Sequence, residues 1–148
     1  MSIILRVYTS IMVEACICTA LRQAAAQSTS HYDAMLAPAG VKVTMFRLLR
    51  RINDATNLSI SALAADVGLD RSTLGRNLRV LERQSLIKMS VGEDGRKRMI
   101  SLTDMGRVTL VAAEPLWRRA QADYAQMIGA DTMALLERLA AHEVGRQI

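Results

Sequence analysis

Arginine and hydroxyl side chains recur at helical spacing in residues 71–83, "RSTLGRNLRVLER". At about 100° per residue, a helix over this segment carries its leucines, at positions 74, 78 and 81, on one face. The opposite face carries Ser72, Arg76, Arg79 and Arg83, with Thr73 at its flank. Guanidinium and hydroxyl groups hydrogen-bond to phosphate oxygens and to the base edges exposed in the DNA major groove. The segment therefore predicts a DNA-reading helix, and the alternative is an ordinary solvated basic face.

A second basic cluster follows in residues 92–98, "GEDGRKR". Asp-Gly between the strand-like segments 86–91 and 97–102 predicts a tight hairpin, because glycine tolerates the positive φ of the turn. Arg96 and Lys97 then belong to the hairpin, where arginine suits a narrow, electronegative minor groove. Residues 70–98 hold eight cations and four anions, a net charge of +4 in a chain whose total is +5. Charge concentrated in this way favours a nucleic-acid surface.

The elements that must position these side chains form a helix-turn-helix. In residues 60–81, Ala64, Gly68 and Leu74 have the spacing at which two helices approach closely, turn and pack. A basic hairpin directly after a helix-turn-helix is a wing. The second helix then enters the major groove, and the hairpin tip reaches the flanking backbone or minor groove.

Capping and breaking residues predict the remaining boundaries. Ser59 or Ser61 is expected to cap the first helix of the motif, and Asp70 the second, which runs to about residue 84. A helix is expected to start at Thr103, and Pro115 to kink or restart it, because proline lacks the amide donor. The other helices are expected over residues 12–36, 41–52 and 131–145. The predicted fold class is mainly α with a small β-hairpin wing: a winged helix-turn-helix plus N- and C-terminal dimerisation helices.

Composition and charge set broad limits. The 148 residues are 51% apolar and 3% aromatic, which suits one mostly helical domain. The pI near 9.8 suggests a polyanionic partner, although a mildly basic enzyme would look the same. Arg6 and Glu14 interrupt the apolar residues 1–21, so neither a membrane span nor a signal peptide is expected. Met12 is an alternative start, which would make residues 1–11 an extension. Two cysteines form no disulfide framework, and a cytoplasmic location is expected.

Residues 14–145 resemble the MarR family of winged-helix transcriptional regulators. The most specific part is "EDGRKRMISLTDMGR", which is similar to the family's wing signature in Asp94, Arg96, Leu102, Thr103 and Gly106. The segment "LDRSTLGRNLRVLERQSLIK" resembles the family's recognition helix and the entry to its wing.

The resemblance implies a role for each basic segment. Arg96 would be the wing-tip residue that reaches toward the minor groove, with Lys97 beside it, and Asp94 would support the hairpin without touching DNA. Ser72, Thr73 and Arg76 would make the major-groove contacts. Arg79 and Arg83 would contact the DNA backbone or be merely exposed.

The resemblance also implies a homodimer on a near-palindromic double-stranded operator. The expected division is an N-terminal dimerisation helix in 1–40, a DNA-binding domain in 41–104 and C-terminal dimerisation helices in 105–148. The apolar runs "MVEACICTAL", "VTLVAAEPL" and "MALLERLAA" fit this division, because a wing domain of about 60 residues is too small to cover them.

Two groups of residues are candidates for receiving a signal. Cys16 and Cys18 are each either a small buried or interface residue, or a peroxide-sensing thiol, or part of a disulfide between subunits. His31, Tyr32 and Arg47 either line a cleft for a small aromatic ligand, as in relatives, or pack at the domain junction. Two distant histidines and one Cys-x-Cys give no metal site, and no cofactor motif or catalytic pattern stands out.

The function that these features predict is a DNA-binding transcriptional regulator, a dimeric repressor relieved by a small ligand, and not an enzyme. The alternatives are an oxidant-sensing regulator that acts through Cys16 or Cys18, and a winged-helix protein-interaction module. One residue departs from a good helix: Gly75 costs about 1 kcal/mol against alanine. It either permits close approach to a base or phosphate or is simply tolerated.

Overall fold

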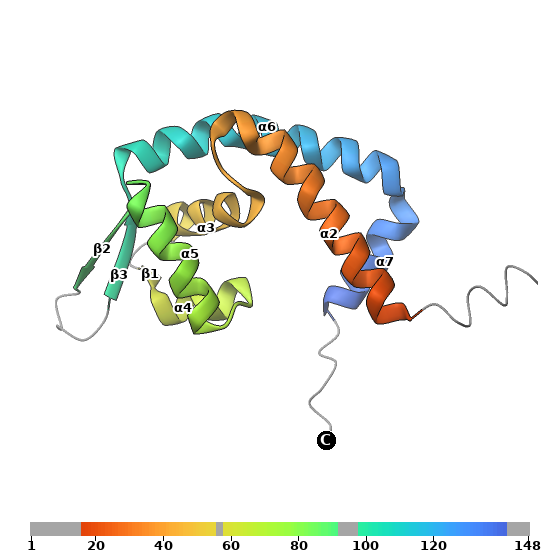
Figure 1. Ribbon diagram of the computed structural model, residues 1–148, viewed down its shortest axis with the longest axis horizontal. Coiled ribbons are helices and arrows are strands. Elements are labelled where there is room, and N and C mark those ends of the chain that lie inside the picture. The colour runs from red at the N-terminus through yellow and green to blue at the C-terminus, as the bar shows by residue number, and fades with distance from the viewer. Residues whose placement is uncertain (1–15, 56–57, 92–97, 142–148) are drawn as a thin grey trace, which may run out of the picture.

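The computed structural model of the chain describes residues 16–55, 58–91 and 98–141 (Figure 1). The elements in chain order are α2 (Ile17–Leu36), the 3-10 turn η1 (Ala37–Ala39), α3 (Val43–Asp54), β1 (Leu58–Ser59), α4 (Ile60–Val67), α5 (Arg71–Arg83), β2 (Ile87–Val91), β3 (Arg98–Leu102), α6 (Asp104–Ile128) and α7 (Ala130–Ala141). The predicted class, mainly helical with a small β wing, is confirmed.

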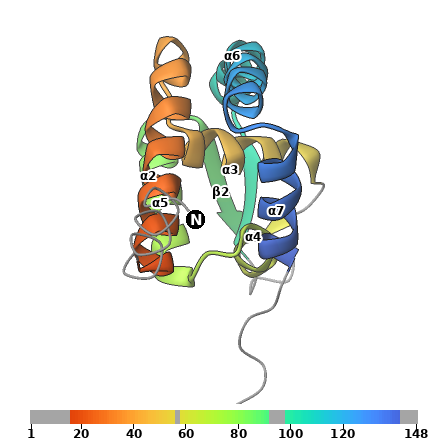
Figure 2. The same cartoon turned by 90° about the vertical axis from the view of Figure 1, so that its right-hand side faces the viewer.

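The described elements form a lobe and an arm that share one long helix. In Figure 1, α3, α4, α5 and the three strands gather beneath one end of α6, whereas α7 descends from its other end and α2 descends from near its middle toward α7. Figure 2 shows α2 and α7 as two separate columns on the arm side. The chain therefore separates the basic helix α5 and the strands from most of α2 and α7.

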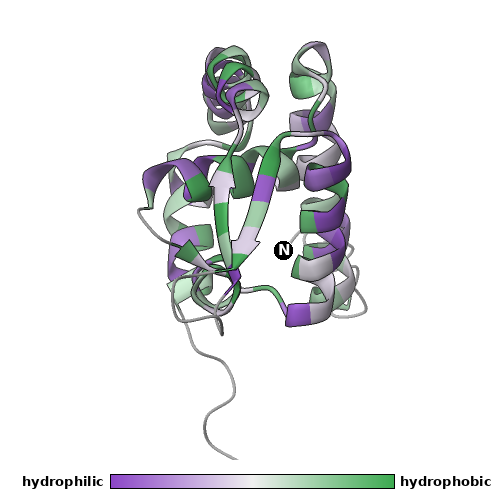
Figure 3. Cartoon of the chain, turned by 90° about the vertical axis from the view of Figure 1, so that its left-hand side faces the viewer, coloured by the Kyte–Doolittle hydropathy of each residue, from purple (hydrophilic) through white to green (hydrophobic). Residues whose placement is uncertain are grey.

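The core lies in the lobe and is made by amphipathic helices. Figure 3 shows hydrophilic and hydrophobic bands alternating along the helices. Burial of the apolar bands removes their area from water, the main favourable term in folding. The largest fully buried side chains are Leu36, Phe46, Leu48, Leu49, Leu63, Leu74, Leu78 and Leu81. These residues come from α2, α3, α4 and α5, so the helix-turn-helix is an integral part of the core.

The sheet has one more strand than the sequence predicted. Its order is β1-β3-β2, all antiparallel, with Leu58 opposite Ile100 and Ile87 opposite Leu102. The predicted hairpin strands are confirmed to within one residue at each start. Strand β1 has only two residues, too few for an alternating pattern, and it forms because β3 offers a free edge. The prediction of two strands is therefore corrected to three.

Pro115 does not interrupt its helix. We expected a kink or a restart there; the restart is wrong, because α6 continues as helix from Asp104 to Ile128 with Pro115 inside it. Proline removes the hydrogen bond to the carbonyl four residues earlier, at Val111. Val111 is 74% exposed, so water can satisfy that carbonyl. None of the helices in the described ranges is both long and apolar enough to cross a membrane.

Candidate nucleic-acid interface

Two side-chain caps and one glycine build the turn between α4 and α5. The Ser59 hydroxyl accepts a hydrogen bond from the Ala62 amide at 3.2 Å, which starts α4. Gly68 ends that helix in the left-handed conformation, with φ 65°, where a residue without Cβ is least strained. The Asp70 carboxylate accepts from the Thr73 amide at 2.9 Å and starts α5. The predicted helix-turn-helix is confirmed, with Ser59 rather than Ser61 as the first cap.

Asp70, Thr73 and Arg76 form a chain of contacts on the first turns of α5. Hydrogen bonds from the Thr73 side chain and backbone hold the pKa of Asp70 below its usual range, and the Ser72 amide and the Arg76 charge add to this. Arg76 Nη2 in turn donates to Thr73 Oγ1 at 3.3 Å. Thr73 therefore links the cap to the arginine, which restricts the guanidinium before any ligand is bound.

The two faces of α5 divide as the spacing predicted. Leu74, Leu78 and Leu81 are 0–1% exposed and bury the inner face. The outer face is exposed and polar, and it carries Ser72, Arg76, Arg79 and Arg83. A surface groove runs along it beside Val80 and Glu82. Glu82, which the prediction left out of this face, adds one negative charge at the groove.

Strands β2 and β3 form the base of the predicted hairpin and follow α5 in the chain. Val91 at the end of β2 pairs with Arg98 at the start of β3, and both are exposed. The candidate wing residues Asp94, Arg96 and Lys97 lie outside the described residues. What the structure establishes is the base of the hairpin, in register and directly after α5.

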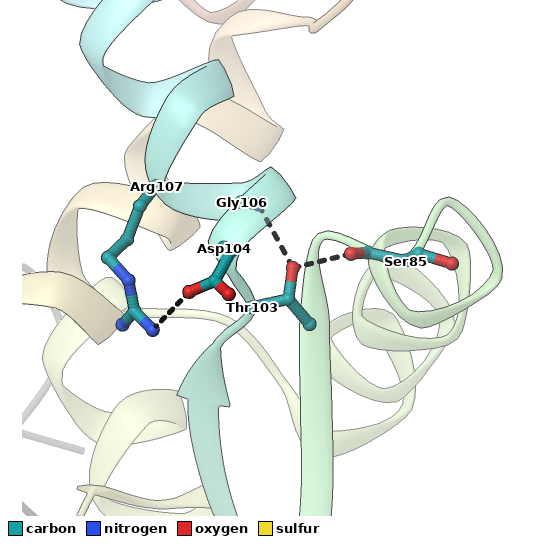
Figure 4. Close-up of polar contacts among 5 residues, drawn as sticks. All are labelled: Ser85, Thr103, Asp104, Gly106 and Arg107. Atoms are coloured by element: carbon teal, nitrogen blue, oxygen red, sulfur yellow. Dashed lines mark hydrogen bonds and ion pairs between the residues drawn. The ribbon is translucent and has the colours of Figure 1, made fainter.

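Thr103 joins the end of the wing to the turn after α5 (Figure 4). Its hydroxyl donates to the Ser85 carbonyl at 2.5 Å and accepts from the Gly106 amide at 3.0 Å. Its own amide donates to the Leu86 carbonyl at 3.1 Å. At the same helix start, Arg107 forms an ion pair with Asp104 at 3.0 Å. One residue thus caps α6 and ties it to the chain that links α5 to β2.

Gly106 is required by the same junction. A Cβ atom on this residue would lie 1.9 Å from the Leu86 carbonyl oxygen, a distance that no side chain tolerates. The neighbouring Ser85 has φ 58°, a left-handed conformation that is uncommon outside glycine. The Leu-Thr-x-x-Gly part of the wing signature is therefore explained by packing. Leu102 is buried in the core, Thr103 joins the start of α6 to Ser85, and Gly106 lets α6 approach the backbone of Leu86.

An ion pair that the sequence did not indicate joins α3 to α4. Arg51 Nε and Nη2 donate to the two carboxylate oxygens of Asp66. This pairing lowers the pKa of Asp66 and raises that of Arg51. Nothing in the spacing of the two residues, on different helices, could have revealed the pair.

Of the three residues predicted to line a ligand cleft, the structure places two in one aromatic cluster, and the cleft itself stays a prediction. His31 and Tyr32 on α2 form an aromatic cluster with Tyr124 on α6, with ring centroids 5.4–5.9 Å apart. Arg47 is instead exposed on α3, where its charge helps to lower the pKa of Asp66. Tyr124 was missed because its proximity to His31 arises only when α2 packs on α6.

The aromatic cluster holds one unsatisfied polar atom. Tyr32 Oη donates to Gln121 Oε1 at 2.5 Å, and burial raises the Tyr32 pKa. His31 Nε2 is buried and has no hydrogen-bond partner among the described residues. Such an atom is costly when it stays unpaired, so the cluster has a free hydrogen-bonding position.

Both cysteines are exposed in the single chain, not buried within it. Cys16 is the N-cap residue of α2, and Cys18 lies in its first turn. Hydrogen bonds from the Thr19 side chain and backbone, and from the Cys18 backbone, lower the Cys16 pKa. The sequence suggested no influence of this kind, because it comes from the helix start rather than from a nearby cation.

The fold and the interface define a winged helix-turn-helix protein. The family model described as "MarR family" matches residues 41–97. The transcriptional regulator MosR of Mycobacterium tuberculosis, solved in complex with DNA, is 37% identical, with 85% of this chain and 96% of that chain covered and a TM-score of 0.74. The chain therefore belongs to the MarR family of transcriptional regulators.

Two further structures are similar. The transcriptional repressor CouR, bound to a 23-mer DNA duplex, is 25% identical over 84% of this chain and 90% of that chain, with a TM-score of 0.75. MarR from E. coli in its apo form is 18% identical over 88% of this chain and 98% of that one, with a TM-score of 0.65, which shows the shared fold. A search of curated proteins found no match to this chain.

Proposed function

We propose that this chain is a dimeric, sequence-specific DNA-binding repressor that occludes a promoter and is released by a small aromatic ligand. The observation that carries the proposal is α5, whose leucine face is buried and whose exposed face is rich in arginine. Two similar proteins, MosR and the repressor CouR, have been solved with DNA, and this supports the proposal. Because such a regulator acts on chromosomal DNA, we propose a cytoplasmic location.

In this proposal α5 enters the major groove. Ser72, Thr73 and Arg76 contact base edges, because they occupy the first turns of the exposed face. Arg79 contacts a phosphate. Arg96 and Lys97 on the wing contact the flanking backbone or minor groove, and Asp94 supports the hairpin. The contact between Arg76 and Thr73 supports Thr73 as a residue that also aims the arginine.

We propose that 41–104 is the DNA-binding domain and that 1–40 and 105–148 form the dimer. The arm supports this, since α7 buries none of its own residues in the single chain. The large apolar side chains left exposed on the arm are Ile17, Leu21, Met127, Leu135, Leu136 and Leu139. A two-fold dimer places two α5 helices about 34 Å apart, which matches a near-palindrome.

The ligand would bind at the cluster of His31, Tyr32 and Tyr124. The unpartnered His31 Nε2 offers a hydrogen bond, and the three rings offer an aromatic surface. Because the cluster bridges α2 of the arm and α6, a ligand there can change how the two lobes of a dimer are spaced. Arg47, which lies beside Asp66 instead, is left out of this site.

Cys16 supports a second candidate, in which an oxidant is the signal. Its exposed sulfur and lowered pKa favour the reactive thiolate. Peroxide should then abolish DNA binding, and a Cys16→Ala/Cys18→Ala double variant should bind DNA whether or not peroxide is present. Equal loss in both proteins would rule out this signal.

The DNA-binding proposal is tested by fluorescence anisotropy with the DNA upstream of the chain's own gene, a scrambled duplex and a salt series. Tight binding to the native fragment alone, with a steep salt dependence, is expected. A flat salt dependence with weak binding would favour a protein-interaction module. Added aromatic carboxylic acids should weaken the binding, and His31→Ala should remove that effect.

A further inference from the structure

Gly75 has no role within the chain. It lies inside α5, where glycine is less favourable than alanine because it loses more backbone freedom on folding. A Cβ atom built on Gly75 would meet nothing within 4 Å. The glycines with positive φ among the described residues are Gly40, Gly68 and Gly129, so Gly75 has an ordinary helical backbone. Neither packing nor conformation in the free protein explains this residue, in contrast to Gly106.

The surroundings of Gly75 are basic. Arg71 and Arg79 lie one helical turn before and after it, on the same side of α5, and both are exposed. Neither guanidinium forms an ion pair within the described ranges, and Glu82 is the carboxylate on this flank. Arg71 Nη2 donates to Ser61 Oγ at 3.1 Å, which extends the polar strip to the first turn of α4. Backbone without a side chain at Gly75, with an arginine one turn away on either side, is a suitable binding position for a DNA phosphate.

We propose that a phosphate of the operator backbone lies directly over Gly75, between Arg71 and Arg79, and that the missing side chain permits this approach. The inference rests on the proposed DNA-binding function and adds a specific contact to it. The glycine lowers the stability of α5, and the absence of a side chain lets the phosphate approach the helix closely. Adding a methyl group should therefore stabilise the free protein and weaken the complex.

The test compares Gly75→Ala and Gly75→Leu with the wild type, all as full-length chains. The probe is a duplex enriched from a random pool by the wild-type protein, together with duplexes that change one base pair at a time. Asn77→Ala is the matched control, because it also raises helix propensity in α5 but lies on the flank away from Gly75. Arg76→Ala is the control for loss of a base contact.

Gly75→Ala should raise the thermal midpoint by about 2–4 °C and lower DNA affinity at least ~10-fold, with a larger loss for Gly75→Leu. The loss should be the same on every base-pair variant, as for a phosphate contact, whereas Arg76→Ala should lose selectivity at one position. Asn77→Ala should gain stability and keep its affinity.

Three results would overturn the inference. Unchanged affinity in Gly75→Ala would show that nothing approaches this backbone. A loss confined to one base pair would place a base edge there instead of a phosphate. A lower thermal midpoint would mean that the chain itself uses the glycine. If the wild type enriches no duplex at all, the proposed function fails and this inference falls with it.

Discussion

The hydroxyl of Thr103 donates a hydrogen bond to the carbonyl oxygen of Ser85 at 2.5 Å. These residues are 18 positions apart, and the bond fixes the start of α6 against the turn that follows α5. Since α6 also forms the arm with α2 and α7, Thr103 is a point at which the arm is joined to the chain segment that follows α5.

Replacing Thr103 by valine keeps the shape of the side chain but removes its hydroxyl. We expect the free energy of unfolding to fall by about 1–3 kcal/mol, because the α6 cap and the bond to Ser85 are both lost. Urea unfolding at one fixed protein concentration measures this. Thr103→Ser keeps the hydroxyl and should stay close to the wild type; equal losses in the two variants would contradict the role of the hydroxyl.

Gly106→Ala should be among the most damaging single-methyl additions in this chain. The added Cβ would lie 1.9 Å from the Leu86 carbonyl oxygen, so α6 or the start of β2 has to move. We expect a loss of about 3 kcal/mol in the free energy of unfolding. Gly75→Ala, the same chemical change in an open position, should have the opposite sign. Similar effects of the two variants would refute the packing argument.

The ion pair between Arg51 and Asp66 should make stability depend on pH. Pairing lowers the folded-state pKa of Asp66 below the ordinary value of 3.8, so its contribution is present above that value and is lost as the pH falls through the folded pKa. Unfolding midpoints measured between about pH 5 and pH 2 should therefore fall less in Asp66→Asn than in the wild type. Parallel curves would show that the pair contributes nothing measurable.

Arg51→Lys separates the charge of that pair from its geometry. Lysine keeps the positive charge but cannot donate to both carboxylate oxygens in the planar arrangement of arginine. We expect the free energy of unfolding to lie between the values for the wild type and Arg51→Gln, with the pH effect reduced. A lysine variant that matches the wild type would assign the effect to charge alone.

Arg96→Ala tests the wing. We expect operator affinity to fall by about 1–3 kcal/mol while the proposed dimer stays intact, since Arg96 lies between β2 and β3 in the sequence, outside the helices of the arm. Anisotropy measures the affinity, and sedimentation measures the dimer. Unchanged affinity would remove the wing from the DNA contacts.

Cys16 should react with iodoacetamide faster than an ordinary exposed thiol at neutral pH. Its lowered pKa raises the thiolate fraction, and the hydrogen bond from the Thr19 side chain is the largest cause. Thr19→Val should therefore slow the alkylation of Cys16. Mass spectrometry of timed samples measures this, in a Cys18→Ala background so that one thiol is followed.

What the sequence by itself determined is local. The choice of Ser59 or Ser61 as one cap, the cap at Asp70, the end of α4 at Gly68 and the leucine face of α5 depend on residues at most one or two turns apart. The hairpin strands were also predicted, because Asp-Gly and the flanking residues are contiguous. These signals were specific enough to identify the family and to select the basic face of α5.

Only the tertiary structure decided the contacts between distant segments. The bond from Thr103 to Ser85, the pair of Arg51 with Asp66 and the placing of Tyr124 beside His31 exist because particular helices pack together. The extra strand β1 forms for the same reason, since two residues become a strand only where β3 presents an edge. The order of residues along the chain specifies which side chains share a face of each helix. Which residues of two helices contact each other depends on how all the helices pack into one core.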